Sequence, residues 1–90
     1  MRKLSLSDNE IVDITPLANL TKLKDLNLDK NKISNILSLG KLKRLEYLDL
    51  SSNEISDIYP LGNLSRLNEL IVKQDYIQDV NTLSNNKELI

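Results

Sequence analysis

The feature that most constrains this chain is a 22-residue period that its polar and apolar residues share. Written in lines of that length, residues 4–25 read LSLSDNEIVDITPLANLTKLKD and residues 26–47 read LNLDKNKISNILSLGKLKRLEY. Residues 48–69 and 70–90 continue the same columns. Such self-similarity indicates one structural unit used several times, and a single unit of this size cannot bury its own leucines. The sequence therefore predicts a stack of about four coils.

The spacing of the apolar residues changes along each line and predicts the path of one coil. Leu26 and Leu28 stand two apart, so in a strand they point to the same side. From Leu17 the apolar step is three, which fits a 3₁₀ or extended return better than an α-helix. We expect strands that start near residues 3, 25, 47 and 69. The predicted fold class is an α/β solenoid, a right-handed coil with a parallel β-sheet on its concave face and 3₁₀ or extended returns on its convex face. Residues 1–90 are expected to form one domain.

One polar column has a structural explanation. Asn9, Asn31 and Asn53 stand where each coil bends inward and leaves backbone groups without strand partners. An Asn side chain offers two donors and an acceptor, so it can serve both kinds of backbone group. We expect a structural Asn ladder at these positions. Asp75 takes the place of the fourth Asn and lacks the donors, so looser geometry is expected in the last coil.

The repeat resembles that of a known family. The pattern Leu23-x-x-Leu26-x-Leu28-x-x-Asn31-x-Ile33 is similar to the leucine-rich-repeat signature. The stretches at 9–17 and 53–61 share the form NxIxDIxPL, which resembles the 22-residue repeats of bacterial internalin-type proteins. The resemblance implies a curved solenoid that binds another protein through its concave face, usually at a cell surface. The first residues run straight into a strand, and no signal peptide is expected. The compartment therefore stays unknown.

The side chains between the strand leucines form the candidate binding surface, which we call the strand face. Its columns vary in chemistry while the leucine columns do not, as expected for a scaffold that carries a specific surface. Tyr47 is the strongest candidate, because Tyr is enriched at binding hot spots. Ile71 is expected to be exposed, and Tyr76 to lie just past the strand on the same side. The alternative is that all these positions are merely solvated. The candidate partner-binding residues are Asp25, Asn27, Asp29, Tyr47, Asp49, Ser51, Glu69, Ile71, Lys73 and Tyr76, beside Lys3, Ser5 and Ser7 of the first coil.

The residue types that the chain lacks exclude several classes of function. It has no Cys and no His, which rules out thiol nucleophiles, Ser-His-Asp triads and thiolate or imidazole metal sites. Residues 25–29 begin like a calcium loop, but Lys30 and Ile36 stand where such a loop needs Gly and Glu. No Gly-rich phosphate loop is present. We therefore expect no enzyme, no cofactor and no metal.

The charge pattern narrows the kind of partner. The chain has 12 basic and 13 acidic residues, which gives no reason to expect nucleic acid or membrane insertion. A basic stripe precedes the strands, and we interpret it as a solvated edge because no aromatic residues interleave it. The strand face carries four carboxylates against Lys3 and Lys73, a net charge of −2. The stripe comprises Lys22, Lys24, Lys41, Lys43, Arg44, Arg66 and Lys87 against Glu46 and Glu88.

The sequence thus predicts a non-enzymatic protein–protein interaction module that binds a partner protein through the concave strand face. An alternative is an assembly or structural unit. The apolar ends of the solenoid would then pack against another copy, giving a homo-oligomer, or the chain would be a fragment of a longer array. The remaining alternative is an accessory part of an enzyme whose catalytic domain lies elsewhere.

Overall fold

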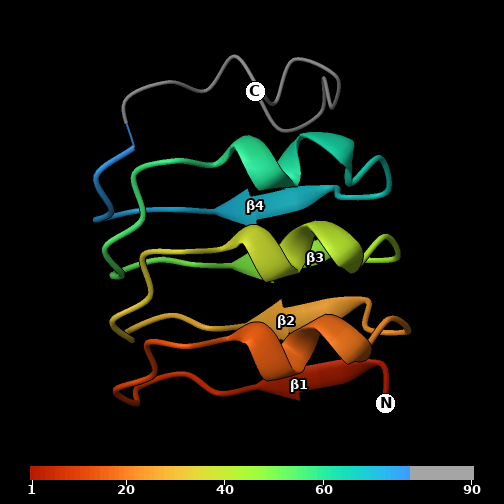
Figure 1. Cartoon of the computed structure of the whole chain (residues 1–90), viewed down its shortest axis with the longest axis horizontal. Helices are drawn as coiled ribbons and strands as arrows, with labels where there is room; N and C mark the ends of the chain where they lie inside the picture. The colour runs from red at the N-terminus through yellow and green to blue at the C-terminus, as the bar shows by residue number, and fades with distance from the viewer. Residues whose placement is uncertain (78–90) are drawn as a thin grey trace.

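The structure is a computed structural model that describes residues 1–77. Its strands form one parallel sheet in chain order, and each residue of a strand pairs with the residue 22 positions further on, as Leu4 does with Leu26. Figure 1 shows the coils stacked one above another, with the strands on one side and the returns on the other. The predicted parallel solenoid is confirmed. The strands are β1 (Lys3–Ser5), β2 (Asp25–Asn27), β3 (Tyr47–Asp49) and β4 (Glu69–Ile71).

The described returns contain 3₁₀ helices, so of the two expected forms, 3₁₀ and extended, the 3₁₀ form is the one observed. In the first coil the N–H of Leu17 donates to the carbonyl of Ile14, Leu20 to Leu17, and Leu23 to Leu20, at 2.9–3.1 Å. Each bond spans three residues, so the apolar step of three keeps every leucine on the inner side of a three-residue turn. The fourth expected return, with Leu83 and Asn86, lies outside the described residues. The helices are η1 (Thr15–Asn19), η2 (Leu37–Lys41) and η3 (Tyr59–Asn63).

Each return begins at a side-chain oxygen that accepts from the backbone two residues later. Asp13 Oδ1 accepts from the N–H of Thr15 at 3.0 Å, and Asn35 Oδ1 accepts from that of Leu37 at the same distance. The third coil repeats the bond from Tyr59 to Asp57 at 2.8 Å. The sequence analysis missed this role, although the column carries the residue types that form such turns. Asn replaces Asp in the second coil without loss, because only the acceptor is used.

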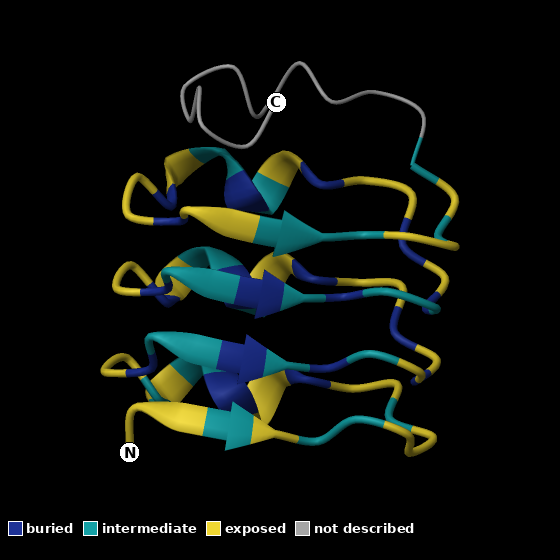
Figure 2. Cartoon of the chain, turned by 180° about the vertical axis from the view of Figure 1, so that it is seen from behind, coloured by how far each residue is buried: buried dark blue, intermediate teal, exposed yellow. Residues whose placement is uncertain are grey.

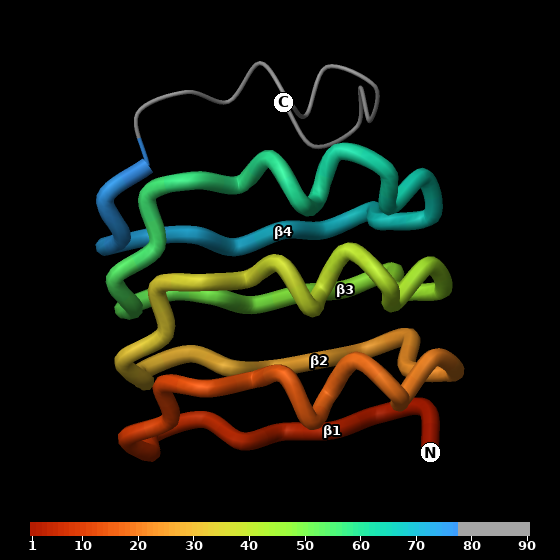
Figure 3. Tube along the Cα trace, in the orientation of Figure 1, coloured from red at the N-terminus to blue at the C-terminus, as the bar shows by residue number. Residues whose placement is uncertain are grey.

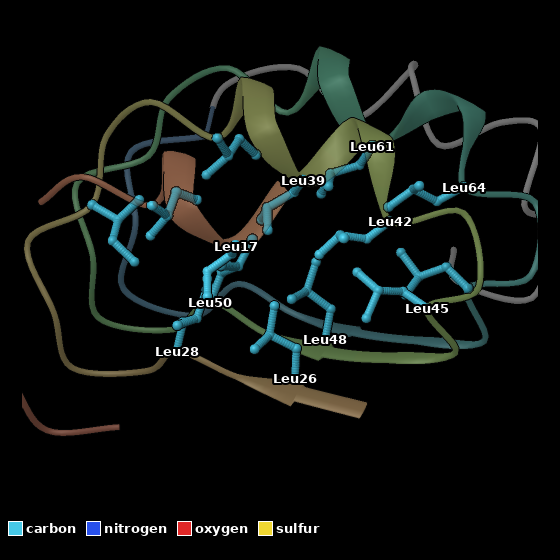
Figure 4. Close-up of a cluster of buried hydrophobic side chains, with 14 of the residues drawn as sticks. Leu17, Leu26, Leu28, Leu39, Leu42, Leu45, Leu48, Leu50, Leu61 and Leu64 are labelled. Atoms are coloured by element: carbon cyan, nitrogen blue, oxygen red, sulfur yellow. The ribbon is translucent and has the colours of Figure 1, made fainter. Parts of the chain in front are cut away.

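The core is a column of aliphatic side chains enclosed between the sheet and the returns. In the second and third coils almost every repeated Leu and Ile is fully buried, and Figure 4 shows these side chains meeting between the strands and the 3₁₀ turns. The first coil is less enclosed, and its Leu4, Leu6, Ile11 and Leu20 are half-buried. Figure 2 shows the same trend in colour, with buried segments concentrated in the inner coils. Neighbouring coils therefore supply the cover that one coil lacks.

A strained backbone position recurs once in every coil, between the strand and the inward bend. Asp8, Lys30, Ser52 and Gln74 all have φ between 57° and 62°, the left-handed region that disfavours residues with a Cβ. The column contains no glycine, so the sequence gives no sign of this conformation. The turn directs the next residue, Asn or Asp, into the interior of the bend.

Candidate functional site

The inward bend is held by the amides of Asn31 and Asn53. The Nδ2 group of Asn53 donates to the carbonyls of Leu28, Leu50 and Ser51 at 3.0–3.1 Å. Its Oδ1 accepts from the N–H of Ile33 at 3.0 Å. One side chain thus satisfies four backbone groups in two successive coils, which accounts for the burial of a polar residue.

Asn31 makes the same set of bonds one coil earlier, and the two amides are linked through shared acceptors. The carbonyl of Leu28 accepts from Asn31 at 2.9 Å and from Asn53 at 3.0 Å. Asn9 is exposed and donates only within its own coil, to Leu6 and Ser7. The Asn column is therefore a chain of amides bridged by carbonyls rather than amides bonded to one another.

Asp75 keeps only part of this arrangement. Its Oδ1 accepts from the N–H of Ile55 at 3.1 Å, as the amide oxygens do in the earlier coils. Its Oδ2 is enclosed and has no hydrogen-bond partner among the described residues. Burial raises the pKa of the Asp75 carboxyl, backbone N–H groups partly offset this, and the negative charge of Asp49 adds to the rise.

The strand face consists of the side chains that point away from the core along the four strands. The sheet register places Tyr47 between Asp25 on one neighbouring strand and Glu69 on the other. The next outward column places Asp49 between Asn27 and Ile71. Adjacent strands lie about 4.8 Å apart, so each of these residues is within side-chain reach of its neighbours. Figure 3 shows the strand segments running side by side at regular spacing.

Tyr47 lies half-buried in an acidic environment. Burial is the main cause that raises the pKa of its hydroxyl, and Asp49, Glu69, Asp25 and Asp29 raise it further, in that order. All four carboxylates of the strand face thus act on one phenol group. Tyr47 is therefore the centre of a locally negative surface.

Several polar atoms of this face are held in place while others are left without a partner. Asp49 Oδ1 accepts from the N–H of Ser51, and Asn27 Oδ1 accepts from that of Asp29, both at 3.0 Å. These bonds fix the two side chains against their own backbone. The Oδ1 of Asp29 and the hydroxyl of Ser51 are enclosed, and neither has a hydrogen-bond partner within residues 1–77.

The remaining predicted site residues differ in burial and position from the residues around Tyr47. Ile71 is half-buried rather than exposed as the sequence suggested, and Lys73 is exposed beyond the end of β4. Tyr76 is 63% exposed but lies in the bend after Asp75, in the column of Lys32 and Glu54, and not in a strand column. The strand residues form one surface, and Tyr76 lies outside its columns.

The opposite side carries a feature that the sequence analysis did not single out. Leu37 and Tyr59 start successive 3₁₀ helices and are 70% and 76% exposed. Two shallow hollows of about 270 and 420 Å³ flank Leu37, and Val12 and Pro60 line one each. The sequence signal that could have identified this exposed apolar position was Leu37 itself, an apolar residue that follows Ile36 and lies outside the repeated leucine columns.

The described part of the chain holds no group of three or more acidic side chains placed to bind a metal ion. The same residues contain no helix with the length and hydropathy needed to cross a bilayer.

Comparison with known proteins places the chain in a family. A family profile described as "Leucine rich repeat" matches residues 1–55, and a second, described as "Leucine Rich repeats (2 copies)", matches residues 43–85. The chain belongs to the leucine-rich-repeat family. None of the curated protein sequences compared with this leucine-rich-repeat chain matches it significantly.

Solved structures show which leucine-rich-repeat proteins are similar. Internalin C2 from Listeria monocytogenes is 40% identical over the whole chain, with a TM-score of 0.96. An internalin F structure from the same organism is 31% identical with a TM-score of 0.83. A leucine-rich-repeat protein of Leptospira interrogans is 29% identical over 96% of the chain, with a TM-score of 0.84. The resemblance to internalin-type repeats is confirmed.

The chain spans 40%, 34% and 23% of the lengths of these three proteins. A plant peptide hormone receptor, solved in complex with a peptide hormone, is 25% identical over 98% of the chain, with a TM-score of 0.81. The chain covers 15% of that receptor. Leucine-rich-repeat proteins of this kind are generally interaction modules without enzymatic activity.

Proposed function

We propose that this chain is a protein-binding module that engages its partner through the strand face, with Tyr47 at the centre of the contact. The carrying observation is the arrangement of outward side chains on a rigid parallel sheet, where the register places Asp25, Tyr47 and Glu69 side by side. Of the strand leucines beside them, Leu26 and Leu48 are fully buried and Leu70 is half-buried. A surface whose scaffold is fixed and whose side chains differ from coil to coil is suited to specific recognition.

The likeness to the plant receptor supports a function in binding a partner, since that leucine-rich-repeat protein was solved with a bound peptide. The half-buried position of Tyr47 supports its central role, because hot-spot residues lie in partly enclosed positions that lose water on binding.

The test compares strand-face variants with matched variants elsewhere, against a partner selected from a displayed library of protein fragments. Tyr47→Ala is paired with Tyr59→Ala on the return side, and Glu69→Lys with Glu54→Lys in a bend. We expect the strand-face variants to weaken binding about tenfold or more while their melting temperatures stay unchanged. If Tyr47→Ala and Glu69→Lys bind normally and Tyr59→Ala does not, the strand face is the wrong surface.

A second candidate is end-on assembly through the first coil. Leu4, Leu6 and Ile11 are only half-buried, and Asn9 makes no bond to a preceding coil. Another coil, from a second copy or from a longer array, would complete both the core and the Asn column. Light scattering coupled to size exclusion tests self-association, and a monomer at high concentration would exclude it.

A further inference from the structure

The strand face has a charge pattern that restricts what can cover it. Asp25 and Glu69 flank Tyr47 on the two neighbouring strands, and Asp49 lies two residues further along the same strand and on the same side. Asp29 belongs to the next outward column of the second coil. Three carboxylates therefore lie next to one aromatic ring, and the fourth, that of Asp29, lies two columns further along the strand direction.

Few cations of the chain compensate this charge. Lys3 Nζ lies 3.8 Å from Asp25 Oδ2, and this is the only ion pair in residues 1–77. Its Lys side chain is 81% exposed, so the pair contributes little and is easily exchanged. Asp49 and Glu69 have no cation within ion-pair distance among the described residues. Within residues 1–77 the basic stripe lies at the end of η2, at Lys41, and in the turns and bends before the strands. The unpaired carboxylates next to Tyr47 are thus those of Asp49 and Glu69, and Lys73 of the fourth coil lies two columns away from Glu69.

Covering such a face has a physical cost that depends on the charge of the partner. A neutral surface would remove water from the carboxylates without replacing its hydrogen bonds, which is unfavourable. An anionic surface, such as nucleic acid, would add repulsion. A cationic side chain pairs with the carboxylates and also attracts the electron-rich face of the Tyr47 ring.

The spacing of the charges also fits an extended chain. Asp25 and Glu69 lie two strand spacings apart, or about 10 Å. An extended segment covers that distance in about three residues. Two basic residues separated by one or two others can therefore meet both carboxylates at once.

We propose that the strand face binds a cationic, extended segment of a partner protein, with an Arg or Lys side chain seated on Tyr47 between Asp25, Asp49 and Glu69. This inference rests on the proposed function and adds the chemistry of the partner. Arg suits the position better than Lys, because its planar group can stack on the ring while it pairs with a carboxylate.

The test is a selection of random peptides displayed on phage against the whole chain, followed by affinity measurements with the purified peptides. The double variant Asp49→Asn with Glu69→Gln removes two charges and leaves the acceptor for Ser51 in place. The matched control, Glu10→Gln with Glu54→Gln, removes two charges from exposed bends. A synthetic peptide that alternates Gly and Arg, and its counterpart with Glu in place of Arg, serve as direct probes.

We expect the selected peptides to be enriched in Arg and Lys and to bind the double variant at least about tenfold more weakly. The control variant should bind them normally, the Arg probe should bind more weakly as salt is raised, and the Glu probe should not bind. Selected peptides without basic enrichment whose binding is lost in Tyr47→Ala would overturn the cationic partner and leave the strand-face function standing. If no selected peptide depends on Tyr47, both proposals fail.

Discussion

Replacing Asp75 by Asn should stabilise the fold, because it completes the Asn column of the fourth coil. In the third coil the Nδ2 group of Asn53 donates to three carbonyls within 3.1 Å, two in its own coil and one in the coil before. By the repeat register the equivalent acceptors for Asp75 are the carbonyls of Leu50, Val72 and Lys73. A carboxylate oxygen cannot donate to them, and Oδ2 of Asp75 is enclosed with no hydrogen-bond partner within residues 1–77.

The size of the effect follows from hydrogen-bond energetics. An enclosed polar atom left without a partner costs about 1–3 kcal/mol, and a typical protein hydrogen bond contributes about 1 kcal/mol. We therefore expect Asp75→Asn to raise the free energy of unfolding by about 2 kcal/mol. For a domain of this length that corresponds to a rise of roughly 10 °C in melting temperature.

The stabilisation expected from Asp75→Asn should increase with pH. The pKa of Asp75 is raised in the folded protein above its unfolded value of about 3.9. The ionised carboxyl therefore destabilises the fold fully above the folded pKa, and this penalty disappears as the pH falls toward the unfolded value. Asp75→Asn should accordingly gain more at neutral pH than near pH 4.

The assay is thermal unfolding followed by circular dichroism at both pH values, with hydrogen exchange of the Ile55 amide as a local readout. The control is Asp13→Asn, the same replacement at an exposed carboxyl whose pKa is lowered by the backbone N–H of Thr15. This control should give no gain at either pH. If Asp75→Asn gives no gain at neutral pH, or the same gain at both values, the account of the unpaired oxygen is refuted.

Further predictions concern the bends and the returns. Asn53→Ala should lower the free energy of unfolding by about 3 kcal/mol or more in urea titrations, whereas Asn9→Ala, which is exposed, should cost about 1 kcal/mol or less; equal losses would contradict the bridging role. Lys30→Gly relieves a positive φ and should stabilise by up to about 1 kcal/mol, while Lys32→Gly should destabilise by a similar amount, and a loss in both would show that the turn carries no strain. Gly40→Ala places a Cβ 3.1 Å from the carbonyl oxygen of Pro60 and should cost about 1 kcal/mol, so an unchanged melting temperature would show that the returns can separate freely.

Much of the fold could be predicted because burial imposes a period on the sequence. Leucines two apart mark a strand, and leucines three apart mark a 3₁₀ turn. In such a turn each leucine N–H donates to the carbonyl three residues earlier, as the N–H groups of Leu17, Leu20 and Leu23 do. The left-handed turn could not be predicted in the same way. Lys30, Ser52 and Gln74 share no chemistry, since the conformation is imposed by the register of the coils and not by the residue itself.

The candidate site could likewise be predicted only in part. Alternation along the strands was enough to assign Asp25, Tyr47 and Glu69 to the outward side, and the register then sets them side by side. The burial of Ile71 was not predicted, because the shape of a surface depends on the lengths of neighbouring side chains as well as on their direction. Which of these residues touches a partner is not encoded in one chain, since a contact is defined by two surfaces.

The amides of the Asn column also determine how such a chain can change in length. Asn31 donates to the carbonyl of Leu6, 25 residues earlier, and accepts from the N–H of Ile11, 20 residues earlier. Insertion or deletion of one residue between these points would misplace one of the two bonds, whereas adding 22 residues would preserve both. The array can therefore grow or shrink only by whole coils. Each duplication adds one row of outward side chains, so recognition can diversify without a new fold.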